Sequence, residues 1–344
     1  MDFDFDAVVK KGGESNEATK CFDAFAVSVE NAWTLSDFKE MVTKLFPEVN
    51  GKDEYDTKIR KLFEKFSDGK ELISTSGFTM MWNNWIKTIL WPKSAFIIVD
   101  VQNDFISGSL ALKNAPAQQD GEEVVSVINH LINKDTPFAA IVYTQDWHPE
   151  NHISFFENVK LRKVIGMNEK PVVNDAELNN LKPLDIVVFE GPPKTEQKLW
   201  PRHCVQNTKG AEFHPKLVVS PDSIKIQKGT NENIDSYSAF FDNEKLSETS
   251  LNAELKKRGI TDVYVCGLAY DVCVYFTALQ SNELGYRTVV VDDACRGVVS
   301  SDILKVKETL KGKNCAIVQS SEIDSMIKAV DRRFVLGYFL ALNV

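Results

Sequence analysis

The 344-residue sequence has no apolar run long enough to cross a membrane, and its first residues lack a basic stretch followed by an apolar one. A spanning helix needs about 18 consecutive apolar residues, and a secretory signal needs both of those parts. We therefore expect neither feature. The apolar tail at 334–344 is too short to span a bilayer, and we expect it to pack on the protein or on a partner.

Positive charge is also scarce, because 40 Lys and Arg residues stand against 49 Asp and Glu residues and give a net charge of -9. Nucleic acids and anionic membranes attract basic proteins. The composition therefore argues against both as main partners. A homo-oligomer stays open.

Cysteines are few, and none belongs to a CxxC pair; the six lie at positions 21, 204, 266, 273, 295 and 315. Disulfide frameworks belong to oxidising compartments, whereas scattered thiols are typical of reduced proteins. The sequence therefore predicts a cytoplasmic protein, with the nucleus as the alternative.

The chain changes character near residue 92. Before it, apolar residues recur at helical spacing in 34–46, 54–67 and 75–91, with polar turns between them. We predict an all-helical module over 1–91 and a second domain over 92–344.

Beyond residue 93, short β-rich runs alternate with amphipathic segments. This alternation predicts an α/β fold, a three-layer parallel sheet with helices on both faces, which places its chemistry at the carboxyl ends of strands. The predicted strands are 94–101, 138–146, 185–191, 223–229, 263–268, 288–295 and 315–320, and the predicted helices are 122–135, 251–259, 272–285 and 300–313.

Residues 63–78 have the outline of an EF-hand, a helix, a loop and a second helix. A calcium loop needs carboxylates at positions 1, 3 and 5 and a Glu at position 12. With Ile73 at the usual β-position, these four positions hold Phe66, Asp68, Lys70 and Gly77. We therefore predict an EF-hand-like pair without high-affinity calcium binding, which packs on the second domain or mediates assembly.

Three reactive side chains lie at or just beyond predicted strand ends: Asp100, Lys228 and Cys273. A thiol near a helix N-terminus has a lowered pKa. A carboxylate can take its proton, and a lysine can hold that carboxylate ionised. Each residue alone is more often structural, so the prediction depends on the combination of nucleophile, base and electrostatic support.

A second cluster combines Asp146 and His148 with His203. Residues two apart on an extended segment point to the same side, so the first two can reach one ion. Two imidazoles and one carboxylate suit a divalent transition metal, Zn²⁺ first, with Fe²⁺ or Mn²⁺ as alternatives. We expect His152 to have a supporting rather than a ligand role, and nothing predicts an organic cofactor.

With these residues in place, the sequence resembles the nicotinamidase family within the isochorismatase-like cysteine hydrolases. Five blocks carry the resemblance in the family's order, spread over most of 94–300. They are VDVQNDF (99–105), TQDWHPENHISF (144–155), LWPRHCVQNTKGAEFH (199–214), KG followed by YSAF (228–240), and GLAYDVCV (267–274).

The resemblance implies an amidohydrolase that acts on a linear amide, converting nicotinamide to nicotinic acid and ammonia through a cysteine thioester in NAD salvage. It implies Cys273 as nucleophile, Asp100 as base and Lys228 as the third catalytic group. It also implies the metal ligands Asp146, His148 and His203.

The same resemblance implies a ring slot and an oxyanion hole. Phe105, Trp200 and Tyr237 correspond to the slot, although core packing explains each of them about as well. A cis peptide is implied between Leu268 and Ala269, with the backbone amides of Ala269 and Cys273 facing the oxyanion.

Two positions depart from the family pattern. Val272 stands where some members have an aromatic residue, and the segment 157–198 looks long, which is typical of a lid or an oligomer contact. The alternatives are a related cysteine hydrolase of another small amide or ureido compound, and an inactive binding protein on the same fold.

Overall fold

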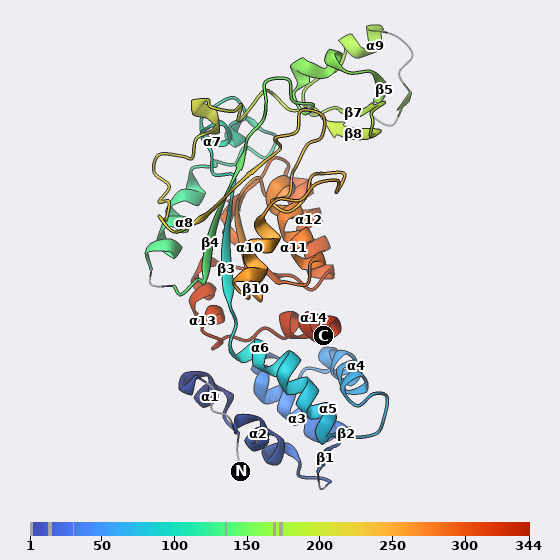
Figure 1. Cartoon of the computed structure of the whole chain (residues 1–344), viewed down its shortest axis with the longest axis vertical. Helices are drawn as coiled ribbons and strands as arrows, with labels where there is room; N and C mark the ends of the chain where they lie inside the picture. Colours follow the sequence, from blue (N-terminus) through green and yellow to red (C-terminus); the bar gives the residue numbers. More distant parts are fainter. Residues whose placement is uncertain (1–2, 13–15, 30, 135, 168–169, 172–174) are drawn as a thin grey trace.

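The computed structural model describes residues 3–12, 16–29, 31–134, 136–167, 170–171 and 175–344. The molecule is elongated: an α/β body lies in the middle, the N-terminal helices lie at one end, and a small second sheet projects from the other end (Figure 1). Within these described ranges, no helix combines the length and the apolar character that a membrane crossing requires.

The body is built on six parallel strands in the order β12-β11-β10-β3-β4-β9. Every residue of β10 and β3 is buried, whereas the edge strand β9 alternates between buried and more exposed positions. Continuous apolar runs form the centre of a covered parallel sheet, so the predicted fold class is confirmed. The strands are β3 (Ser94–Val99), β4 (Ala140–Asp146), β9 (Ile224–Lys228), β10 (Asp262–Leu268), β11 (Arg287–Arg296) and β12 (Ala316–Val318).

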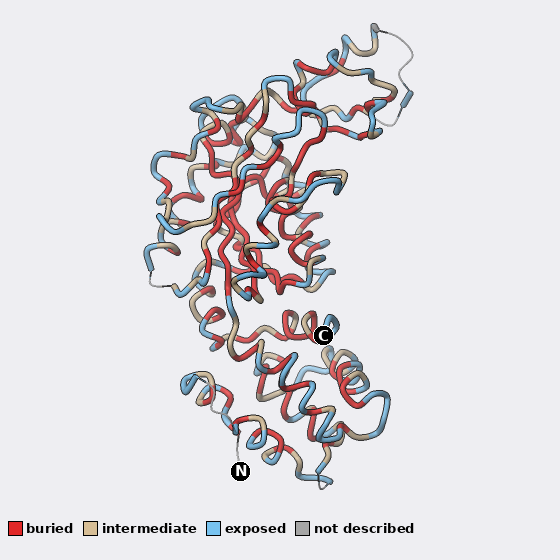
Figure 2. Tube along the Cα trace, viewed as in Figure 1, coloured by how far each residue is buried: buried red, intermediate tan, exposed pale blue. Residues whose placement is uncertain are grey.

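Helices cover both faces of this sheet: α8 lies on one side, and α10, α11 and α12 lie on the other (Figure 1). Burial is concentrated along the central strands and the inner sides of these helices (Figure 2). The helices of the body are α7 (Asn103–Ile106), α8 (Glu123–Asn133), α10 (Leu251–Lys257), α11 (Tyr275–Glu283), α12 (Ser300–Gly312) and α13 (Ile323–Ile327).

The projecting part is a four-stranded antiparallel sheet in the order β6-β5-β7-β8. The strand expected at 185–191 lies here as β7 and not in the parallel sheet, which corrects that prediction. A short apolar run has the same sequence pattern in either sheet, because periodicity does not reveal which strand it will pair with. The elements are β5 (Val164–Met167), β6 (Lys170–Pro171), α9 (Asp175–Asn179), β7 (Ile186–Phe189) and β8 (Thr195–Lys198).

The N-terminal part is helical, with one two-residue strand pair, β1 (Ala32–Trp33) with β2 (Ile73–Ser74). The segment 75–91, expected as one helix, consists of α5, then a π-helical turn η3 (Trp82–Ile86), and then α6. Its helices are α1 (Phe5–Lys11), α2 (Glu17–Phe25), α3 (Leu35–Leu45), α4 (Asp56–Phe66), α5 (Thr75–Met81) and α6 (Lys87–Leu90).

The EF-hand-like loop does not gather acidic groups. Asp68 extends into solvent, with 91% of its side chain exposed, and its partner is Lys70 at 3.6 Å. Gly77 stands at the position of the usual Glu, and a Cβ there would lie 2.7 Å from the carbonyl oxygen of Phe66. This closed geometry agrees with the calcium prediction, which itself stays a prediction.

The C-terminal helix α14 (Phe334–Asn343) lies between the body and the N-terminal helices (Figure 1). Leu336 belongs to the core of the body. Phe334, Tyr338 and Ala341 belong to the core formed by the N-terminal helices. The tail therefore packs on the protein itself, and the domain division at residue 91 stays a prediction.

Candidate active site

Four neighbouring strands end at the same edge of the sheet, and each brings one reactive side chain there. Asp100 directly follows β3, whereas Asp146 and Lys228 are the last residues of β4 and β9. Cys273 lies beyond β10, in the π-helical turn η7 (Tyr270–Val274) that precedes α11. Because the strands are parallel and adjacent, the four side chains converge.

Lys228 is the centre of this group. Its Nζ lies 2.9 Å from Oδ2 of Asp100, 3.3 Å from Sγ of Cys273 and 2.5 Å from Oδ1 of Asp146. It also donates a hydrogen bond to the carbonyl oxygen of Ser236 at 3.0 Å. Burial would favour the neutral amine, but the two carboxylates outweigh it and hold the Lys228 pKa well above its usual value.

Asp100 is completely buried, and both of its carboxylate oxygens have a partner. Its Oδ1 accepts a hydrogen bond from Oγ1 of Thr144 at 2.5 Å, whereas Oδ2 pairs with the Lys228 ammonium at 2.9 Å. One carboxylate oxygen lies within 4.8 Å of the Cys273 sulfur. Burial raises the pKa of Asp100 to about 6, against the opposing effect of Lys228. A carboxylate in this setting can accept a proton near neutral pH.

The Cys273 thiol is buried, and burial raises its pKa well above the usual value despite Lys228. The expectation that a helix N-terminus lowers this pKa was therefore wrong, because desolvation outweighs the helix dipole here. The resting group is a thiol, so nucleophilic attack requires a base within reach.

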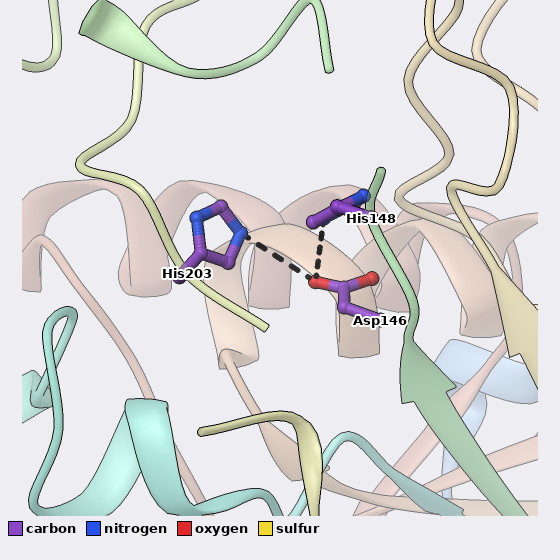
Figure 3. Close-up of side chains that lie close together, drawn as sticks. All are labelled: Asp146, His148 and His203. Carbon is purple, nitrogen blue, oxygen red and sulfur yellow. Dashed lines mark ion pairs between the residues drawn. The ribbon is translucent and has the colours of Figure 1, made fainter. Parts of the chain in front are cut away.

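Asp146, His148 and His203 form a second, contiguous group (Figure 3). The Nε2 atoms of the two histidines lie 3.6 Å and 3.8 Å from the same oxygen, Oδ2 of Asp146. Their Nδ1 atoms face the carbonyl oxygens of Gly229 at 2.8 Å and Pro201 at 2.7 Å. Since a carbonyl only accepts, each Nδ1 carries a proton, and in the neutral ring Nε2 is the atom that presents a lone pair.

This donor set fits a metal ion. Ligand atoms about 2.1 Å from a tetrahedral ion lie about 3.4 Å apart, close to the spacing of these three atoms. Burial and the neighbouring His148 lower the pKa of His203 to about 4, which keeps that imidazole neutral. The residues present can therefore hold one divalent transition metal.

His152 packs against this group, and His148, His152 and Asp235 also offer ligand atoms within 4.8 Å of one another, so the supporting role of His152 stays a prediction. Its ring stacks on that of His148 with centroids 4.0 Å apart. Its Nδ1 lies 2.7 Å from Oγ of Ser154, and its Nε2 lies 3.9 Å from Oδ1 of Asp235. No sequence pattern marks Asp235, because its place depends on the path of the loop after β9.

A small pocket opens at these two groups, lined by Cys273 and by Asp146, His148 and His203. Phe105, Trp200 and Tyr237 all line it, and Nε1 of Trp200 donates a hydrogen bond to Oη of Tyr237 at 3.2 Å. Four further lining residues could not be predicted, because their approach to the pocket follows no sequence period. They are Leu110, Leu112, Asp235 and Val298.

The remaining predicted positions also lie at this pocket. Cys273, Ala269 and Val272 line it, and the peptide bond between Leu268 and Ala269 is cis, as expected.

Comparison with known proteins shows the family. The model of the isochorismatase domain matches residues 94–322. The chain belongs to the isochorismatase family. The nicotinamidase of Acinetobacter baylyi is 40% identical over 205 residues, which cover 59% of this chain and 81% of that protein.

Solved structures of nicotinamidases share the fold. An Acinetobacter baumanii nicotinamidase pyrazinamidase matches with a TM-score of 0.55 and 35% identity, covering 67% of this chain and 97% of that one. The yeast nicotinamidase bound to the inhibitor nicotinaldehyde matches with a TM-score of 0.52 and 31% identity, covering 66% of this chain and 99% of that one.

Proposed function

We propose that the protein is a nicotinamidase, which hydrolyses nicotinamide to nicotinic acid and ammonia. One observation carries the proposal: a buried thiol, carboxylate and ammonium meet, and the thiol lines a small pocket that two imidazoles and a second carboxylate border. The identity to nicotinamidases over most of their length supports the choice of substrate.

In the first half of the reaction, Asp100 takes the Cys273 proton, since one of its carboxylate oxygens lies within 4.8 Å of the sulfur, and the thiolate attacks the carboxamide carbon. Lys228 balances the negative charge that then passes between sulfur and carboxyl. We assign the backbone amides of Ala269 and Cys273 to the developing oxyanion, since both residues line the pocket.

In the second half, Asp100 returns its proton to the departing ammonia and leaves a thioester on Cys273. The same carboxylate then takes a proton from a water molecule, which attacks the thioester carbon. The C–S bond breaks, Asp100 returns the proton to the Cys273 sulfur, and nicotinic acid is released. One base serves both halves because its raised pKa, about 6, lets it gain and lose a proton near neutral pH.

Phe105, Trp200 and Tyr237 would bind the pyridine ring, and the Asp146, His148 and His203 set would hold the metal. When bound, such an ion supplies a Lewis acid for a heteroaromatic nitrogen or a water. We propose Zn²⁺, with Fe²⁺ or Mn²⁺ as alternatives, because two imidazoles and one carboxylate are ordinary ligands of these ions.

Nicotinamide hydrolysis would place the protein in NAD salvage. We also propose the cytoplasm as its location, since all six cysteines are buried and free, which suits a reducing compartment.

The test is ammonia release from nicotinamide compared with a ureido compound, each with and without a transition-metal chelator. We expect the protein to release ammonia from nicotinamide and not from the ureido compound. The chelator should abolish this activity, and added Zn²⁺ should restore it. Faster turnover of the ureido compound would contradict the substrate, and active protein without bound transition metal by elemental analysis would contradict the metal site.

A further inference from the structure

Asp104, at the start of α7, takes no part in the chemistry above, yet its carboxylate is bonded on both oxygens. Oδ2 accepts a hydrogen bond from the backbone N–H of Cys204 at 2.7 Å, and Oδ1 accepts one from the backbone N–H of Ser109 at 3.2 Å. A carboxylate that accepts two backbone N–H groups fixes the segments that carry them. Asp104 thus joins two turns that are about 100 residues apart in the sequence.

The peptide groups of Cys204 connect this clamp to both histidines of the metal set. Cys204 directly follows His203, and its own carbonyl oxygen accepts a hydrogen bond from the backbone N–H of His148 at 3.0 Å. Its backbone has a positive φ of 46°, a conformation that a non-glycine residue adopts only when its surroundings hold it there. Asp104 supplies one of those restraints.

Two glycines leave the space that the carboxylate fills. A Cβ at Gly210 would lie 2.0 Å from Oδ2 of Asp104, and a Cβ at Gly108 would lie 2.2 Å from Oδ1. Any side chain at either position would displace the carboxylate. Gly108 and Gly210 thus leave room for the Asp104 carboxylate on two sides.

We propose that Asp104 is a positioning residue for the metal set: it holds the turn at Cys204 so that His203 and His148 present their Nε2 atoms to Asp146. The proposal rests on the assignment of these three residues as metal ligands. Asp104 also fixes the start of α7, whose Phe105 ring lies 5.5 Å from the His203 ring.

The test measures metal affinity directly, in the full chain, by competition with a chelator of known affinity for Zn²⁺. We expect Asp104→Ala to lower Zn²⁺ affinity at least tenfold, the usual effect of removing a group that orients a metal ligand. Asp104→Asn keeps one acceptor oxygen and should lose less. Once Zn²⁺ is saturating, we expect Asp104→Ala to show a raised KM, because Phe105 is no longer fixed.

Asp293→Ala is the matched control, because Asp293 also clamps a turn: it accepts hydrogen bonds from the backbone N–H of Ser320 at 2.8 Å and from its Oγ at 2.6 Å. It should lower Tm without changing Zn²⁺ affinity. Equal Zn²⁺ affinity in wild type and both Asp104 variants overturns the proposal and leaves the proposed function standing. A wild type that binds no Zn²⁺ overturns the ligand assignment as well, whatever its rate of nicotinamide hydrolysis.

Discussion

Lys228 and Asp146 form a 2.5 Å ion pair between side chains that are almost completely buried. Lys228 also contacts Asp100 and Cys273, whereas Asp146 offers its other oxygen to His148 and His203. The thiol group and the metal set therefore share one electrostatic unit. A change in the charge of the thiol group should therefore alter metal binding, and a change in the charge of the metal set should alter the ionisation of Asp100 and Cys273.

Lys228→Met should abolish ammonia release and weaken Zn²⁺ binding in the same variant. Removing the cation leaves two buried carboxylates without their partner, which costs about 3–5 kcal/mol of unfolding free energy. Urea unfolding and chelator competition measure the two effects. Lys225→Met, on an exposed position of the same strand, should change the unfolding free energy by no more than about 0.5 kcal/mol. Normal Zn²⁺ affinity in Lys228→Met would contradict the electrostatic coupling between the thiol group and the metal set.

The acid limb of the pH-rate profile should report Asp100. The carboxylate accepts the thiol proton only when ionised, and its pKa is raised to about 6. We expect kcat/KM to fall about tenfold for each pH unit below that value. A rate that stays level down to pH 5 would show that another group is the base.

Thr144→Val should move this limb toward higher pH. The Thr144 hydroxyl stabilises the ionised form of Asp100 through the 2.5 Å hydrogen bond, and a hydrogen bond to a charged group contributes about 1.5–3 kcal/mol. Thr144→Ser retains the hydroxyl and should restore the wild-type profile. The measurement is kcat/KM against pH for the three proteins, and superimposable profiles would exclude a role of Thr144 in the ionisation of Asp100.

Cys273→Ala should abolish turnover while the fold and the Zn²⁺ site remain. The substitution removes one buried sulfur, so the loss of unfolding free energy should be small beside the loss of activity. Cys315→Ala, another buried cysteine, is the control and should keep the wild-type rate. Ammonia release by Cys273→Ala at more than a trace would refute the covalent mechanism.

Gly337→Ala tests how α14 is held. Alanine favours a helix by about 1 kcal/mol over glycine, but a Cβ at Gly337 would lie 2.3 Å from the buried ring of Phe46. Overpacking of this kind costs about 1–3 kcal/mol, so we expect a net loss of stability in thermal unfolding. At Gly312, in α12, a Cβ meets nothing within 4 Å, and Gly312→Ala should be neutral or stabilising. A gain of stability in both variants would contradict the tight packing of Phe46 on α14.

The sequence predicts the parallel strands well, because runs such as AFIIV in β3 are apolar throughout and have no other place than a covered sheet. It fails for β7, whose short apolar run carries no information about which sheet it joins. The motif residues Asp100, Lys228 and Cys273 could be found because each lies at or just beyond the end of a predicted strand. The bond from Lys228 to Asp146 could not, since the register of β4 against β9 sets it.

Helix α14 has a practical consequence for any attempt to shorten the chain at its C-terminus. A chain cut after residue 333 would lose Leu336 from the body and would leave Phe46 and Trp85 uncovered, since Phe46 packs against Phe334 and Trp85 donates a hydrogen bond to the carbonyl oxygen of Gly337 at 2.7 Å. Such a fragment would expose apolar side chains to solvent and would aggregate. A shorter enzyme therefore requires redesigned surfaces rather than simple trimming.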